Sequence, residues 1–141
     1  SRQKLKIRNP NATRPFQHVI EPIVGYLRLV ELAYSGDQNY AQGFNFGPNL
    51  TDVCSVESLI QRMNKVWENK IQYEIQSDGS GLHEAQLLSL NCEKAKKILN
   101  WSPKTNLDQA LKMTVGWNEK RLAGENIRKI CLEQIAEFEK L

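Results

Sequence analysis

The sequence predicts an α/β domain with a few short strands and four to five helices, and three observations favour this class. Apolar residues recur at helical spacing in several long segments, which indicates amphipathic helices around a core. Short runs of alternating polar and apolar residues, bounded by Gly, Pro or Asn, indicate strands. The length of 141 residues suits one domain. We therefore expect residues 1–141 to form a single domain, with a sheet too small for a doubly wound nucleotide fold, that is part of a larger fold.

The first part of the chain predicts two strands and one long helix. Residues 4–8, "KLKIR", alternate and predict a strand, and a loop follows to Pro15. From Val19 to Tyr34 the apolar residues are spaced as in a helix, and Pro22 is compatible with its first turn. Residues 43–48, "GFNFGP", are a short apolar run between glycines and a proline, which predicts a buried strand.

The middle of the chain contains the clearest helix. Apolar residues from 56 to 67 fall on one face behind Ser55, a typical N-cap. Residues 71–76, "IQYEIQ", alternate and predict a strand, and residues 78–81 predict a flexible turn. Residues 87–90, "LLSL", are compatible with one more short strand.

The last third of the chain predicts three helices. A short one spans residues 93–99, and a longer one runs from Leu107 up to Gly124. The spacing of Thr105 and Asp108 predicts a capping box before the longer helix, with Asp in place of Glu. The final helix begins at Ile127 and carries a single apolar stripe to the end of the chain.

Composition and charge exclude several classes of protein. The chain is 40% hydrophobic and 25% charged, which does not fit a disordered, collagen-like or disulfide-rich protein. Its net charge is only +3, with basic and acidic residues interleaved, so nothing indicates nucleic-acid binding. Cys54, Cys92 and Cys131 are far apart, which predicts buried or half-buried thiols in a reducing compartment. No apolar run could cross a membrane, and there is neither a signal peptide nor an initial Met, so we expect a cytoplasmic chain cut at its start.

Four stretches carry a family resemblance, and they read "IRNPNATRPFQHVIEPIVGYL", "FNFGP", "HEAQLLSLNCEKAKKILNW" and "TVGWNEK". In this order they resemble the C-terminal half of the nucleotide-sugar dehydratases and epimerases, within the extended short-chain dehydrogenase family. The first stretch together with "HEA" most resembles the CDP-glucose 4,6-dehydratases. The resemblance implies a small C-terminal substrate-binding domain that closes over a nucleotide sugar, beside a Rossmann domain that binds NAD.

The same resemblance implies an activity for the full-length enzyme, a lyase. Such bacterial enzymes convert CDP-glucose to CDP-4-keto-6-deoxyglucose and water, in the synthesis of deoxysugars of the lipopolysaccharide O-antigen. This chain contains neither a GxxGxxG turn after a strand nor a Tyr followed four residues later by Lys. We therefore expect no catalytic, cofactor-binding or metal-binding residue in it, and no turnover by the chain alone; NAD is implied only for the full-length enzyme.

Arg14 is the first candidate for binding the substrate. A guanidinium offers paired, permanently charged donors that match the geometry of a phosphate. The resemblance places Arg14 where the family contacts the diphosphate of the nucleotide sugar, and Pro15 would fix the local backbone. The alternative is an ordinary arginine of a surface loop.

Five further residues are candidates, each with a competing interpretation. Asn9 and Asn11 offer donors to phosphate or ribose, but Asn-Pro is also a turn signal. His18 precedes the first long helix, where it either faces the ligand or packs in the core. His83 and Glu84 lie in the stretch where related enzymes hold the diphosphate or the ribose. The two histidines do not have metal-ligand spacing.

Two other functions remain open on the sequence. The first alternative is a free-standing nucleotide-sugar-binding module. The second is a structural module that dimerises or packs on a partner. A domain separated from its Rossmann partner exposes apolar surface, so we also expect the isolated chain to form a homo-oligomer. The expected partners are thus CDP-glucose or a related nucleotide sugar, the Rossmann domain and a second copy, but neither nucleic acid nor a membrane.

Overall fold

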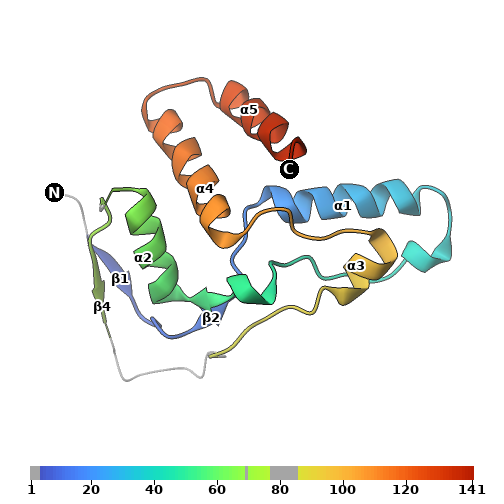
Figure 1. The fold of residues 1–141 in the computed structure, drawn as a ribbon, viewed down its shortest axis with the longest axis horizontal. Coiled ribbons are helices and arrows are strands. Elements are labelled where there is room, and N and C mark those ends of the chain that lie inside the picture. The colour runs from blue at the N-terminus through green and yellow to red at the C-terminus, as the bar shows by residue number, and fades with distance from the viewer. Residues whose placement is uncertain (1–3, 69, 77–85) are drawn as a thin grey trace.

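The structure is a computed structural model that describes residues 4–68, 70–76 and 86–141. It confirms the α/β class, with five helices and a few short strands among these residues (Figure 1). In chain order the elements are β1 Leu5–Ile7, β2 Thr13–Arg14, α1 Ile20–Ala33, the 3₁₀ turns η1 Gln38–Tyr40 and η2 Leu50–Asp52, β3 Cys54–Ser55, α2 Val56–Val66, β4 Tyr73–Ile75, α3 Glu93–Leu99, α4 Leu107–Leu122 and α5 Ile127–Glu139.

The strands form two small sheets of two strands each. β1 and β4 are parallel, and Leu5 and Ile7 are opposite Tyr73 and Ile75. β2 and β3 are antiparallel, and Arg14 is opposite Cys54. Both sheets lie beside α2, whereas α1 and α3 lie at the other end of the molecule (Figure 1). The predicted strands at 4–8 and 71–76 are therefore confirmed, and the structure shows that they pair in parallel.

The helix ends show where the capping predictions hold. The Ser55 side chain accepts a hydrogen bond from the Ser58 N–H at 3.1 Å, so the predicted cap of α2 is confirmed. The predicted capping box of Thr105 and Asp108 is wrong by one residue, because Asn106 and Gln109 form the box that starts α4. Thr105 is instead buried and bonded elsewhere.

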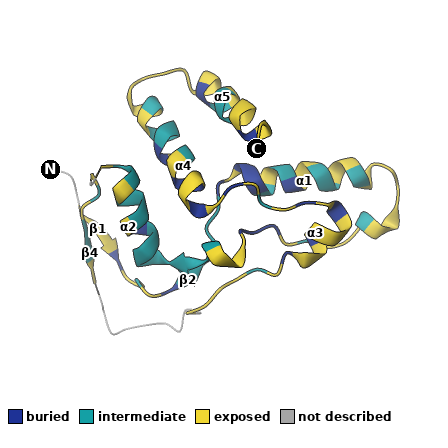
Figure 2. Cartoon of the chain, in the orientation of Figure 1, coloured by how far each residue is buried: buried dark blue, intermediate teal, exposed yellow. Residues whose placement is uncertain are grey.

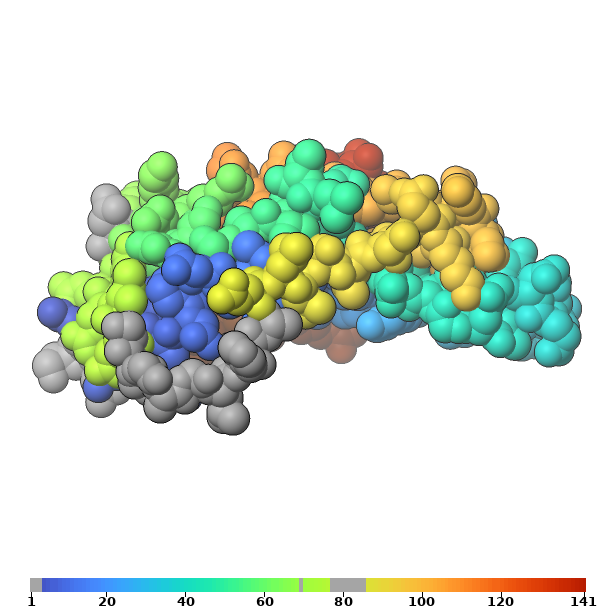
Figure 3. Space-filling model, turned by 90° about the horizontal axis from the view of Figure 1, so that it is seen from below, coloured from blue at the N-terminus to red at the C-terminus, as the bar shows by residue number. Residues whose placement is uncertain are grey.

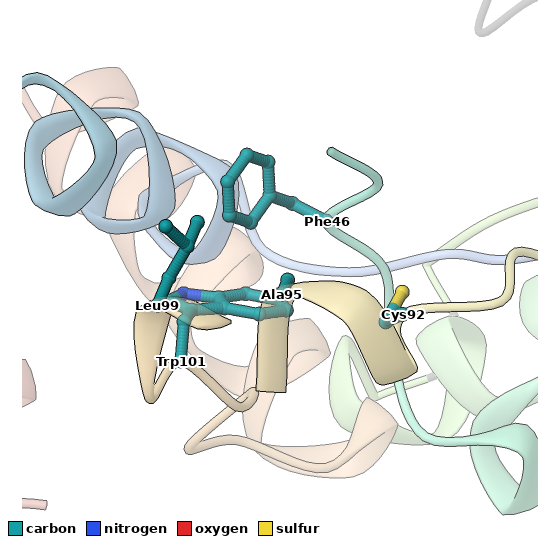
Figure 4. Close-up of a cluster of buried hydrophobic side chains, with 5 residues drawn as sticks. All are labelled: Phe46, Cys92, Ala95, Leu99 and Trp101. Atoms are coloured by element: carbon teal, nitrogen blue, oxygen red, sulfur yellow. The ribbon is translucent and has the colours of Figure 1, made fainter. Parts of the chain in front are cut away.

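A core cluster fills the space between α1 and α3. It consists of Phe46, Cys92, Ala95, Leu99 and Trp101, drawn in Figure 4. The ring of Phe46 stands nearly perpendicular to Trp101 and to Tyr26, with centroids 4.9 and 5.3 Å apart, an arrangement favourable for aromatic pairs. Gly25 of α1 faces Phe46 so closely that a Cβ there would overlap the ring. The helix and the segment that carries Phe46 therefore pack through a glycine.

A buried carboxylate joins α1 to the segment before α4. Glu21 lies in the first turn of α1 and is only 1% exposed. It accepts hydrogen bonds from the N–H groups of Lys104 and Thr105 and from the Thr105 hydroxyl, over 2.6–3.2 Å. Since buried charge is costly unless it is hydrogen-bonded, these bonds fix the start of α1 against this segment.

Two predictions of local structure need correction, and two short strands were missed. Residues 43–48 form no strand, because no other strand of the described chain lies beside them. Residues 87–90 contribute a single bridge, between Leu87 and Thr13. β2 and β3 were not predicted at all, since two residues are too few to show an alternation. The predicted turn at 78–81 lies outside the described residues.

Burial is uneven along the molecule (Figure 2). α1 is buried at its start, at Ile20, Glu21 and Gly25, and becomes mostly exposed or intermediate toward its end. Cys92 is buried, and Cys54 and Cys131 are half-buried free thiols, as expected from the sequence. No helix of the described residues has the length and apolar character that crossing a membrane requires.

Candidate functional site

The backbone of Thr13 and Arg14 is held on both sides by segments distant in the sequence. On one side lies β3, with Thr13 opposite Ser55. On the other, the Thr13 N–H donates to the Gln86 carbonyl at 2.8 Å, and the Leu88 N–H donates to the Thr13 carbonyl at 3.2 Å. Figure 3 shows the yellow segment that begins at Gln86 lying against the blue N-terminal segment. The position of the Arg14 backbone is thus fixed by pairing and not by a loop alone.

The Arg14 side chain is half-buried and bonds to the carbonyl of the preceding residue. Its Nη1 donates to the Thr13 carbonyl at 2.8 Å, and the Arg14 carbonyl accepts from the Phe16 N–H at 3.1 Å. Pro15 lies between these contacts and restricts the backbone further. Arg14 thus lies in a paired strand, and not in an unpaired loop.

The turn that contains Asn9 and Asn11 is held against the start of α2. The carbonyls of Pro10 and Ala12 accept hydrogen bonds from the N–H groups of Glu57 and Val56, both at 3.0 Å. Asn9 and Asn11 themselves are exposed, and the Asn9 carbonyl accepts from the Ala12 N–H at 3.3 Å. The turn signal of Asn9-Pro10 is confirmed, and both side chains lie at the surface beside the Arg14 segment.

His18 is packed at the start of α1. It is 8% exposed, and its Nδ1 accepts a hydrogen bond from the Ile20 N–H at 3.3 Å. Burial lowers the pKa of this imidazole, and the negative charge of Glu21 opposes the shift only in part. Of the two interpretations of His18, these contacts favour packing. His83 and Glu84 lie outside the described residues, although Gln86, two residues after Glu84, is bonded to Thr13.

A groove that the sequence analysis did not identify lies beside His18. It has a volume of about 580 Å³ and is mainly apolar. It is lined by residues of the start of α1, α4 and α5, namely Gln17, His18, Val19, Ile20, Ile23, Thr114, Trp117, Cys131, Gln134 and Ile135. Several of its polar groups already have partners, since Trp117 Nε1 donates to the Cys131 thiol and Gln134 to the Met113 carbonyl. Most of these residues belong to the helical stripes of the sequence, but a stripe does not show how the helices are arranged around a groove.

The stability of the chain is expected to fall as the pH drops below about 6.5, the ordinary pKa of histidine. Because burial lowers the pKa of His18, the unfolded state binds more protons than the folded state between the lowered pKa and the ordinary one. Stability therefore rises with pH through this window and is lost as pH falls through it. Urea denaturation at a series of pH values measures this dependence.

Replacement of the same residue provides the control. His18→Gln should flatten the pH dependence in this window. An unchanged slope in the His18→Gln variant would contradict the assignment of the effect to this imidazole.

Neither a cluster of metal-ligating side chains nor a glycine-containing turn between β3 and α2 occurs among the described residues. No group of three or more potential metal-ligating side chains occurs among the residues described here. β3 runs directly into α2, as a strand does in a dinucleotide-binding turn, but the junction contains no glycine. The first N–H groups of α2 already bond to the Ala12 and Pro10 carbonyls and to the Ser55 hydroxyl. A pyrophosphate would find no unoccupied donors there.

Comparison with known proteins agrees with the resemblance expected from the sequence. No family model matches the chain. The CDP-glucose 4,6-dehydratase of Salmonella typhimurium strain LT2 is 32% identical over 136 residues, which cover 96% of this chain and 38% of that protein. The chain thus spans well under half the length of this relative. The chain is therefore similar, over nearly its whole length, to a part of a CDP-glucose 4,6-dehydratase.

Proposed function

We propose that this chain is the C-terminal, nucleotide-sugar-binding part of a CDP-glucose 4,6-dehydratase. The observation that carries the proposal is the 136-residue match to such an enzyme, which covers nearly the whole chain. The complete enzyme would convert CDP-glucose to CDP-4-keto-6-deoxyglucose and water, in the cytoplasm, for the deoxysugars of the bacterial O-antigen. Residues 1–141 would be its single substrate-binding domain.

Arg14 is proposed to bind the diphosphate of the nucleotide sugar. A diphosphate carries charge on two neighbouring phosphoryl groups, and a guanidinium at a fixed position can pair with their oxygens. The support is the two-sided pairing of Thr13 and Arg14 and the bond from Nη1 to the Thr13 carbonyl, which limit where the guanidinium lies. Asn9 and Asn11 would add neutral donors from the adjoining turn, and His83 and Glu84 remain proposed ligands.

The chemical step is assigned to the part of the enzyme outside this chain. The junction of β3 and α2 does not fit a dinucleotide, so NAD would be bound elsewhere, and no step through NAD is derived from these residues. The role left to this chain is to bind and orient the nucleotide sugar. A structural module that forms a homo-oligomer is the second candidate, and the exposed apolar residues of α1 favour it.

Titration of the chain with CDP-glucose, followed by NMR chemical shifts, tests the proposed function. We expect saturable shifts around Arg14 that are larger for CDP-glucose than for UDP-glucose or inorganic phosphate. Arg14→Ala should weaken binding by at least about tenfold, since a hydrogen bond to a charged group contributes roughly 1.5–3 kcal/mol. Arg128→Ala, which removes an exposed arginine of α5, is the matched control and should bind normally. Equal responses to CDP-glucose and phosphate, or equal affinities of the two variants, would refute the role of Arg14.

A further inference from the structure

The carboxylate of Glu21, which ties the start of α1 to the segment before α4, has acceptor capacity left. Its Oε1 accepts from the Thr105 N–H, the Thr105 hydroxyl and the Lys104 N–H, over 2.6–3.0 Å. Its Oε2 accepts from the Lys104 N–H at 3.2 Å, and no other described residue donates to it. A carboxylate offers about four acceptor positions. Oε2 can therefore accept a further bond once a donor comes within reach.

His18 holds the same start of α1 in a way that depends on its protonation state. The Glu21 N–H donates to the His18 carbonyl at 3.1 Å, so the two residues share one turn. The Nδ1 atom of His18 accepts from the Ile20 N–H at 3.3 Å. A ring nitrogen accepts a hydrogen bond only through its lone pair, so this imidazole is neutral and carries its proton on Nε2. Protonation turns Nδ1 into a donor, and the bond from Ile20 is then lost.

The groups around His18 leave Glu21 as the partner of a protonated imidazole. Burial lowers the pKa of His18, and the negative charge of Glu21, on α1 itself, raises it. Across the groove, α4 and α5 contribute Thr114, Trp117, Cys131 and Gln134 to the lining. The titratable group among these four is Cys131, and a thiol is neutral at the acid pH values at which an imidazole gains its proton. In the described part of the chain, Glu21 is therefore the anion next to His18.

These two side chains lie where α1 meets the last two helices. His18 lines the groove of about 580 Å³ between the start of α1, α4 and α5. The segment that Glu21 holds leads directly into α4, which begins at Leu107 beside the start of α1 (Figure 1). The distance between the start of α1 and the start of α4 therefore depends on the bonds of Glu21. The same bonds set the width of the groove.

We propose that His18 and Glu21 form a proton-sensitive link, in which protonation of His18 draws Glu21 away from Lys104 and Thr105 and opens the groove. At neutral pH, Nδ1 accepts from Ile20 and Glu21 holds the segment before α4. At acid pH, a proton from solvent binds Nδ1, which donates to Glu21 Oε2, and the bonds to Lys104 and Thr105 weaken. A histidine beside a shared acceptor is typical of pH-dependent switches. The link lies within this chain, so it does not depend on the binding of a nucleotide sugar.

NMR and amide hydrogen exchange of the whole chain, over a pH series around the ordinary pKa of histidine, test the link. The carbon-bound protons of the imidazole report the protonation of His18. As it proceeds, the protection of the Thr105 amide should fall at least about tenfold more than that of Val115, a buried residue of α4. An equal fall at both amides would show unfolding of the whole chain and overturn the proposal. Unchanged protection of Thr105 while His18 gains its proton would overturn it as well.

The opening of the groove has a readout of its own. Trp117 lines the groove from α4, and its Nε1 donates to the Cys131 thiol. Its indole N–H signal should shift in the same titration as His18. A loss of protection at Thr105 without a shift at Trp117 would contradict the opening.

Variants of both residues distinguish the link from a histidine that is merely packed. His18→Gln takes up no proton, so the pH-dependent loss of protection at Thr105 should disappear. Glu21→Gln removes the negative charge and should lower the pKa of His18 further, whereas Glu139→Gln, at an exposed position of α5, should leave it unchanged. The pair of glutamate variants is decisive even if His18→Gln does not fold. Equal pKa values of His18 in these two variants, or a loss at Thr105 that persists in His18→Gln, would refute the link.

Discussion

Replacement of Glu21 by alanine is expected to lower the free energy of unfolding by about 3–5 kcal/mol. The carboxylate accepts bonds from three donors, and the substitution leaves the two buried donors of Thr105 and the part-buried N–H of Lys104 without a partner. Each unsatisfied buried donor costs roughly 1–3 kcal/mol, and partial access of water reduces the sum. Urea denaturation followed by circular dichroism measures the loss as a lower midpoint with an unchanged slope.

Two further substitutions serve as controls for Glu21→Ala. One removes only the charge of Glu21, and the other removes an exposed carboxylate elsewhere. Glu21→Gln keeps one oxygen that can accept, so it should cost clearly less than Glu21→Ala. Glu139→Ala removes an exposed carboxylate at the end of α5 and should change stability by no more than about 0.5 kcal/mol. If Glu21→Ala were as mild as Glu139→Ala, the bonds to Lys104 and Thr105 would not hold the two segments together.

Replacement of Trp101 by alanine is the second change with a large expected effect, a loss of about 3–5 kcal/mol, as for other buried large aromatic residues. Trp101 is 4% exposed and packs against the ring of Phe46. Its removal takes apolar area out of the core cluster and leaves a cavity between α3 and the segment that carries Phe46. Calorimetry or urea denaturation gives the size of the loss.

The control for Trp101 tests whether the effect is one of packing. Trp101→Phe keeps an aromatic ring that can meet Phe46 edge to face, so it should cost less than half as much as Trp101→Ala. The two variants should also differ in the exposure of the cluster, which ANS binding reports. Equal losses would show that volume and ring contact at this position matter less than the structure indicates.

The sequence predicted the helices well. It did not predict the strands correctly where a strand depends on pairing with a segment distant in the chain. The apolar period and the Ser55 cap located α2, and Gly124 marked the end of α4 within two residues. β2 and β3 were missed, because two residues show no alternation and their pairing joins segments far apart in the chain. The strand at 43–48 was predicted from a real alternation, but a strand also needs a neighbour, which no local pattern reveals.

The role of the candidate site remains a prediction. A basic, proline-containing segment before a helix indicated Arg14, and the structure adds what the sequence could not show, namely the pairing of that segment on both sides. The interpretation of His18 depended on burial, which a single residue does not encode. Glu21 was not identified, because an acidic residue in a first helical turn is common and its partners are 83 and 84 residues away.

The wide separation of these contacts determines when the site can form. The bonds of Thr13 to Gln86 span 73 residues, and those of Glu21 to Thr105 span 84. Because contacts between distant residues require the closure of long loops, they slow folding and form late. During synthesis the Arg14 segment leaves the ribosome before its partners do, and it reaches its final setting only after residue 88 has emerged. Until then, the proposed diphosphate site lacks the bonds that join Thr13 to Gln86 and Leu88.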